Sequence, residues 1–321
     1  VMKSSLSLAK TYLQQDEVQK ATATLDNETY GPLALAKKLG MPDKSFASDL
    51  YGTELRIVVQ QMTSSGSDPQ ALLERAGKVM ENLRSSVQGT DAPKRLTAIY
   101  VGMARDIREQ LDRAAPGNRT KLVDAFRLFL ERIASTTDDP ATLQWTAATL
   151  IELAESAMGP NKVKADGQSA ELLRTAVKTL ETLQQKTPEP ALNIDYQLGR
   201  AQRMLGNYKQ SIDTLEGLLS KKSMMLEAQI EAALAYEQWA AVVPPKFAGN
   251  AYKSALNGGR PNAQKENTIW GWGRIGQLTM RNPKYKETFF EARYHVALCR
   301  YRWGKAANNL PIIKKSATDI T

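Results

Sequence analysis

The amino-acid sequence predicts an all-α protein, built as a solenoid of antiparallel helix hairpins. Three observations lead to this prediction. Apolar residues recur at spacings of three and four in almost every long segment, alternating β-branched runs are nearly missing, and breaks containing proline or glycine come at short intervals. Helices of roughly 12 to 25 residues joined by short links are typical of stacked helical hairpins.

The apolar periodicity is clearest in five segments, each of which places its aliphatic residues on one helical face. These segments are Leu72–Leu83, Leu96–Leu111, Leu122–Ile133, Leu143–Leu153 and Leu172–Leu183. Between the helices, short stretches combine a helix stop with the N-cap of the next helix. These stretches are Asp68-Pro69, Asp91-Ala92-Pro93, Pro116-Gly117, Asp138-Asp139-Pro140, Gly159-Pro160 and Pro188-Glu189-Pro190.

The stretch from Asn193 to Lys222 has the strongest internal pattern. A first helix carries Leu198-Gly199, a turn carries Gly206-Asn207-Tyr208, and inward positions follow in a second helix at Ser211, Leu215 and Leu218. This pattern resembles one tetratricopeptide repeat. In that family a small residue in the first helix lets the second helix approach closely, a glycine opens the turn, and an aromatic residue after the turn packs into the hairpin.

Further matches occur at about the 34-residue spacing of that family. Upstream, Ala176, Leu180 and Leu183 fit a second helix, and downstream Ala233 and Tyr236 fit the next first helix. At the start of the chain the matching positions are Leu8, Ala9, Tyr12, Ala21 and Leu25. Near the end, Ala297 and Gly304 repeat the seven-residue offset of Gly199 and Gly206.

The resemblance implies an α-α superhelix, a right-handed solenoid whose concave face is lined by first helices. It divides the chain into degenerate N-terminal hairpins at 1–140, tetratricopeptide-like repeats at 141–240, and basic, aromatic-rich helices at 241–321 that continue the array. The alternative architecture is a helical bundle without repeats.

No segment approaches the roughly 18 consecutive apolar residues of a membrane span. The start at Val1 lacks the hydrophobic stretch of a signal peptide. We therefore expect a soluble chain, and the sequence leaves its compartment open. Both ends interrupt helical patterns, so we expect a piece of a longer protein from which an export signal could have been removed.

Few residues could support catalysis. Cys299 and His295 are the chain's single cysteine and histidine, which argues against multi-histidine or cysteine-rich metal sites. They lie four residues apart among apolar neighbours, so we interpret them as packing residues. The segment Gly271–Gly276 matches the dinucleotide fingerprint, but that motif needs a preceding strand and a parallel sheet. We expect its glycines to allow close packing beside Trp270 and Trp272, and we expect neither an enzyme nor a cofactor.

The resemblance implies a scaffold that binds a protein or peptide on its concave face. Positions of the first helices that avoid the buried stripe are the candidate contacts. These are Asn193, Tyr196, Arg200, Arg203, Tyr294, Tyr301 and Arg302. The alternative for the arginines is a solvated face that binds no partner.

Positive charge is concentrated at the C-terminal end. Residues 241–321 contain fourteen Lys and Arg but four Asp and Glu, whereas the preceding 240 residues contain 29 basic and 30 acidic residues. The expected basic patch comprises Arg274, Arg281, Lys284, Lys286, Arg293, Arg300 and Lys305. Interleaved with aromatic residues, it suits an acidic partner or, as a second function, a nucleic acid or anionic surface. Alternatively, the aromatic residues fill gaps between helices and the charges serve solubility.

Overall fold

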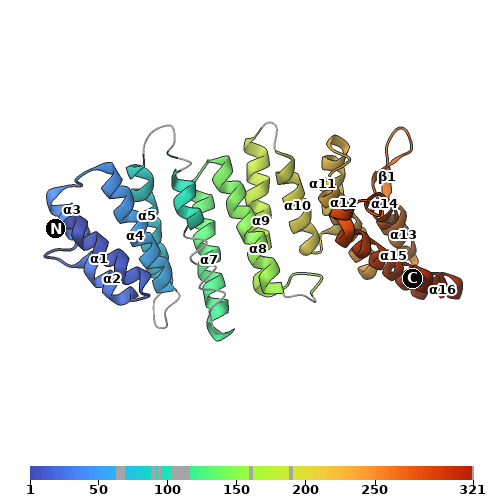
Figure 1. The fold of residues 1–321 in the computed structure, drawn as a ribbon, viewed down its shortest axis with the longest axis horizontal. Helices are drawn as coiled ribbons and strands as arrows, with labels where there is room; N and C mark the ends of the chain where they lie inside the picture. The colour runs from blue at the N-terminus through green and yellow to red at the C-terminus, as the bar shows by residue number, and fades with distance from the viewer. Residues whose placement is uncertain are drawn as a thin grey trace. The chain divides into compact units, whose positions relative to one another are not determined.

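The computed structural model describes residues 1–62, 69–87, 92, 95–102, 116–158, 162–187 and 191–319. The chain divides into two compact units, unit 1 from Val1 to Thr146 and unit 2 from Ala147 to Thr321. Both are built of helices, so the predicted all-α fold is confirmed (Figure 1). The sequence boundary at 140 lies near the division, and the one at 240 falls in the last turn of α12, inside unit 2.

Unit 1 consists of short helical hairpins. Its described helices are α1 (Met2–Gln14), α2 (Val18–Asp26), α3 (Pro32–Leu39), α4 (Lys44–Met62), α5 (Pro69–Ser86) and α7 (Pro116–Thr136), with residues 95–102 also helical. α8 (Pro140–Met158) begins in unit 1 and continues into unit 2.

Unit 2 continues with helix pairs in which consecutive helices pack together (Figure 1). They are α9 (Gly167–Lys186), α10 (Leu192–Met204), α11 (Tyr208–Lys221), α12 (Leu226–Val242), α13 (Pro245–Asn257), α14 (Trp272–Thr279), α15 (Lys286–Ala306) and α16 (Leu310–Thr318). A 3-10 turn at Pro283–Tyr285 leads into α15.

Small residues let the first two helices of unit 1 approach each other. Ala9 of α1 and Ala21 and Leu25 of α2 are fully buried in a core that also contains Leu50 of α4. Leu8 does not join this core, because its side chain is 43% exposed. The N-terminal hairpin was therefore predicted correctly, except for this leucine.

The α10–α11 hairpin has the predicted packing. A Cβ atom on Gly199 would lie 2.6 Å from Cγ of Leu215, so only glycine allows this approach. The Ser211 hydroxyl donates a hydrogen bond to the Gly199 carbonyl at 2.7 Å. Gly206 has φ of +82° in the turn, and Tyr208 is buried after it. The resemblance to a tetratricopeptide repeat is confirmed in this hairpin.

The C-terminal hairpin corrects one predicted register. Gly304 was matched to the turn glycine Gly206, but it lies inside α15, where an added Cβ would meet Cγ1 of Ile313 at 2.6 Å. The turn follows, with Asn308 at φ of +47°. Gly304 therefore allows α16 to pack closely against α15, which is the role of Gly199 in the earlier hairpin.

A short β-hairpin was not predicted. β1 (Gly259–Pro261) pairs antiparallel with β2 (Asn267–Ile269) between α13 and α14. A strand thus precedes the dinucleotide-like motif, but the described residues supply no parallel sheet around it. A Cβ on Gly271 would lie 2.3 Å from the Leu256 carbonyl oxygen, so this glycine serves close packing.

Three helices begin where the sequence predicted. α5, α7 and α8 start at Pro69, Pro116 and Pro140, the first helical position that proline tolerates. The breaks at Gly159-Pro160 and Pro188-Glu189-Pro190 lie outside the described residues, as do Asp68, Asp91, Pro93 and the part of Leu96–Leu111 beyond Gly102. None of the described helices is both long and apolar enough to cross a membrane.

Candidate partner-binding surface

Two of the predicted groove arginines, Arg200 and Arg203, lie in an ion-pair network that joins α8, α10 and α12. Arg203 of α10 is buried, and its Nε donates to Oε2 of Glu231 on α12 at 2.6 Å. Arg200 binds Glu155 of α8, and its Nε lies 3.6 Å from Oε1 of Glu231. Gln238 of α12 accepts a further bond from Arg203 at 3.2 Å. The two arginines therefore connect α8, α10 and α12.

The other two candidates on α10 differ from the arginines. Asn193 is exposed at the start of the helix. Tyr196 is half-buried and packs against the core, and this burial raises the pKa of its hydroxyl above the ordinary value. Of the four candidate residues on α10, Asn193 is the one whose side chain is exposed to solvent.

A second polar cluster surrounds the buried carboxylate of Glu237 on α12. It accepts hydrogen bonds from the Trp272 indole at 3.1 Å and from Arg302 at 3.2 Å, and Nδ1 of His295 lies 2.7 Å away. The thiol of Cys299 donates to the same carboxylate at 3.3 Å. One side chain of α12 thus binds α14 and α15 together.

This cluster contains the cysteine and histidine that the sequence singled out. Cys299 is fully buried, and its burial, followed by the Glu237 charge, raises the pKa of the thiol far above its ordinary range. The His295 ring stacks on Trp272 with centroids 4.3 Å apart. A thiol held protonated is a poor nucleophile. The sequence predicted packing residues among apolar neighbours, whereas the structure places both side chains on the buried carboxylate of Glu237.

The outer face of α15 presents a row of aromatic side chains. Phe290 is 58% exposed, Tyr294 58% and Tyr301 44%. Spacings of four and seven residues place all three on one side of the helix. Nζ of Lys305 lies 5.7 Å from the Tyr301 ring centroid, within cation–π range. We call Phe290, Tyr294, Tyr301 and the nearby cations Lys286, Arg293 and Lys305 the α15 surface.

The predicted basic patch separates into two groups. One member, Arg300, binds Asp319, so its charge is compensated inside unit 2. Arg302, which was predicted as a groove residue, is compensated in the same way by Glu237. The remaining members form no ion pair with a carboxylate among the described residues; they are Arg274, Arg281, Lys284, Lys286, Arg293 and Lys305. Arg274 and Lys284 instead lie over the rings of Trp270 and Tyr285.

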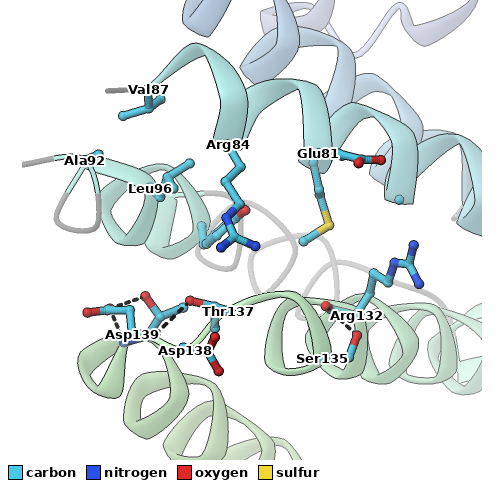
Figure 2. A pocket seen from close by; sticks show the side chains of 14 residues that line it. Glu81, Arg84, Val87, Ala92, Leu96, Arg132, Ser135, Thr137, Asp138 and Asp139 are labelled. Carbon is cyan, nitrogen blue, oxygen red and sulfur yellow. Dashed lines mark hydrogen bonds between the residues drawn. The ribbon is translucent and has the colours of Figure 1, made fainter. Parts of the chain in front are cut away.

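A hollow of about 670 Å³ in unit 1 is a different candidate (Figure 2). Figure 2 shows Arg84 of α5 pointing into it and Asp139 at its edge. Asp139 accepts bonds from the backbone nitrogen and the hydroxyl of Thr142, at 2.8 and 2.6 Å, so it caps α8 as the sequence predicted. Glu81 and Asp138 are the other two acids of the lining, beside Arg84 and Arg132. No cluster of three or more potential metal ligands occurs among the described residues.

Comparisons with known proteins add little to this description. No family model matches the sequence, and no curated protein matches it either. Among solved structures, the crystal structure of the P58(IPK) TPR domain matches 99% of this chain and 83% of its own, with 12% identity and a TM-score of 0.24.

Proposed function

We propose that the chain is a non-catalytic tetratricopeptide-like scaffold that binds an acidic segment of a protein partner on the α15 surface. One observation carries this proposal: three exposed aromatic side chains share a face of α15, beside cations that no described carboxylate neutralises. Exposed aromatic rings grouped with free cations are costly to leave in water and well suited to an amphipathic acidic partner.

The dimensions of the surface suit a short partner helix. Phe290 and Tyr301 are eleven residues apart, which on a helix is a distance of about 16 Å or three turns. Aromatic side chains of this kind supply most of the binding energy of many interfaces. Lys286, Arg293 and Lys305 would pair with carboxylates at the rim and speed association. This corresponds to recognition of an amphipathic helix by its apolar face.

The candidate residues of α10 have another part in this proposal. Arg200 and Arg203 keep α8, α10 and α12 in register, and Arg302 fixes α15 to α12 through Glu237. Tyr294 and Tyr301 contact the partner, while Asn193 and Tyr196 lie on α10 outside the α15 surface. The Arg302–Glu237 ion pair would hold α15 against α12 before the partner binds, which lowers the ordering cost of association.

The test compares three forms of the protein for the partners they retain from host lysate at about 0.15 M and about 0.6 M salt. One is wild type, and one carries Lys286→Glu, Arg293→Glu and Lys305→Glu. The matched control carries Lys178→Glu, Lys209→Glu and Lys222→Glu, which change the same charge at exposed positions of unit 2. Arg300 and Arg302 are unsuitable because their substitution would break internal ion pairs.

We expect a defined protein with an acidic segment to remain with wild type and the control and to be lost from the α15 variant. Its aromatic contacts should keep part of the binding at high salt. Retention by all three forms would contradict the proposal. Recovery of nucleic acid that is released steeply by salt would instead support polyanion binding, the second function that the charge distribution suggests.

A further inference from the structure

A hollow in unit 1 is separate from the α15 surface and independent of the function proposed above. It measures about 890 Å³ and is lined by the end of α2, by α3, by α4 and by α5. Small-molecule sites commonly measure about 300 to 1,000 Å³, so the hollow has room for a small ligand. Its lining combines one buried carboxylate, several exposed lysines and an aliphatic wall, and each of these features restricts the ligand.

The buried carboxylate belongs to Glu54 of α4, whose side chain is 9% exposed. Its Oε1 accepts a hydrogen bond from Nε of Arg75 at 3.1 Å. The same guanidinium donates to both carboxylate oxygens of Asp26, at 3.1 and 3.3 Å, so one arginine is shared between two carboxylates. Oε2 of Glu54 accepts no hydrogen bond from the described residues. A ligand in the hollow can therefore donate to a carboxylate that the protein leaves half-satisfied.

The electrostatics around Glu54 favour a cationic donor. Burial raises the pKa of its carboxyl, and the charge of Arg75 opposes this effect only in part. Asp26 raises the same pKa further, because it is a second negative charge nearby. Tyr51, one turn earlier on α4, also lines the hollow, and burial followed by the Glu54 charge raises the pKa of its hydroxyl. An ammonium group beside Glu54 would compensate this charge.

The exposed side of the hollow has the opposite charge. Lys37 and Lys38 of α3 and Lys78 of α5 lie there, and Glu28 is the one acid among the described lining residues that is not bound to Arg75. Lys38 donates to the backbone carbonyl of Glu28 at 3.3 Å, a contact that supplies no counter-charge. Neither Lys37 nor Lys78 forms an ion pair with a described carboxylate, although the charge of Lys37 also acts on Glu54. An anionic group is therefore favoured on this side.

The rest of the lining is aliphatic. It consists of Leu33, Ala34, Ala36, Met41 and Val79. Leu33, Ala36 and Met41 pack against the buried core of α1, α2 and α4 but remain partly exposed. An apolar group that covers them removes aliphatic surface from water, which is favourable.

We propose that this hollow binds a zwitterionic amino acid with an apolar side chain. The ammonium group would donate to Oε2 of Glu54, and the carboxylate would pair with Lys37 and Lys78. The apolar side chain would cover Leu33 and Met41. Free amino acids and short apolar peptides share this chemistry, so the experiment contains both.

Isothermal titration of the full chain uses four probes: leucine, the dipeptide Leu-Leu, isoamylamine and isocaproate. Isoamylamine is leucine without its carboxylate, and isocaproate is leucine without its ammonium group. The test variants are Glu54→Gln, which removes the buried charge, and Lys37→Gln/Lys78→Gln, which removes two exposed charges.

Each test variant has a matched control in unit 1 outside the hollow. Glu74→Gln removes one carboxylate from an exposed position of α5, and Lys3→Gln/Lys20→Gln removes two exposed lysines. Circular dichroism checks that every variant is folded. The lysine variant decides the test if Glu54→Gln does not fold, because its substitutions are at exposed positions.

We expect leucine, Leu-Leu or both to bind wild type and the two controls with equal affinity. Glu54→Gln should weaken this binding at least about tenfold, because a hydrogen bond to a charged group is lost. Lys37→Gln/Lys78→Gln should weaken it about threefold or more, as expected for exposed ion pairs. Tighter binding of leucine would identify a free amino acid as the ligand, and tighter binding of Leu-Leu a short peptide.

The two single-charge probes test the zwitterion directly on wild type. Isocaproate should bind at least about tenfold more weakly than the tighter zwitterion, and isoamylamine at least about threefold more weakly. Affinity equal to the zwitterion for either probe would overturn the proposal. So would the absence of binding by both zwitterions, or an equal loss in a folded test variant and its matched control.

Discussion

At the scale of single residues, Glu237 connects three helices of unit 2. Its carboxylate is buried on α12 and is surrounded by donors from α14 and α15. A buried charge is tolerated only when its lone pairs are satisfied, and here an indole, a guanidinium and a thiol satisfy them. These contacts hold the helix that carries the α15 surface in place.

Cys299 provides a direct report on this cluster. It is the only thiol in the chain, and burial beside Glu237 raises its pKa, so we expect negligible reaction with Ellman's reagent in the native protein at pH 8. One equivalent should react after unfolding in guanidinium chloride. Rapid stoichiometric reaction of the folded chain would show that the thiol is not buried against Glu237 of α12.

Tyr100 gives unit 1 a pH dependence. Burial raises the pKa of its hydroxyl from 10.0 to about 12, since the fold favours the neutral form. The resulting stabilisation is complete below pH 10 and is lost as the pH rises from 10 to about 12. We expect the 295 nm absorbance titration of wild type minus that of Tyr100→Phe to have its midpoint near pH 12. A midpoint near 10 would contradict the burial of this side chain.

At the scale of helices, substitutions at two glycines distinguish the effect of close helix–helix packing from the effect of intrinsic helix propensity. Gly199→Ala should lower the free energy of unfolding by about 1–3 kcal/mol, because the new methyl overlaps Leu215. Gly217→Ala, in α11 where the added Cβ meets no atom within 4 Å apart from the neighbouring backbone of its own helix, should raise it by up to about 1 kcal/mol. Urea unfolding followed by tryptophan fluorescence suits both, since four of the five tryptophans lie in unit 2. Equal effects would mean that the α10–α11 hairpin is packed less closely than described.

The ion pairs between first helices make a second comparison possible. Glu231→Ala leaves Arg203 buried without its carboxylate and should cost about 3–5 kcal/mol. Glu227→Ala, one turn earlier on α12 at an exposed position, should change stability by less than about 0.5 kcal/mol. Thermal unfolding by circular dichroism measures both. If Glu231→Ala were as mild as Glu227→Ala, the network would not join the helices.

At the scale of the whole molecule, periodicity and proline positions predicted most of the helices, because both act within a few residues. Arg200 and Arg203 were placed on the correct helix, but their partners Glu155 and Glu231 are distant in sequence and no local pattern shows them. The β-hairpin was missed since its strands have three residues each, too few for a period-2 signal. Gly304 was assigned to a turn because the sequence does not show which contact a glycine permits.

The central claim, that the α15 surface binds an acidic protein segment, can be tested by photo-cross-linking in the host cell. A benzophenone amino acid would replace Tyr294 in one form and Leu39 of α3, which is 73% exposed, in the control. We predict that position 294 yields a discrete protein product whose cross-linked peptide is rich in Asp and Glu, and that position 39 does not. Identical products from both positions, or nucleic acid attached at 294, would contradict the claim.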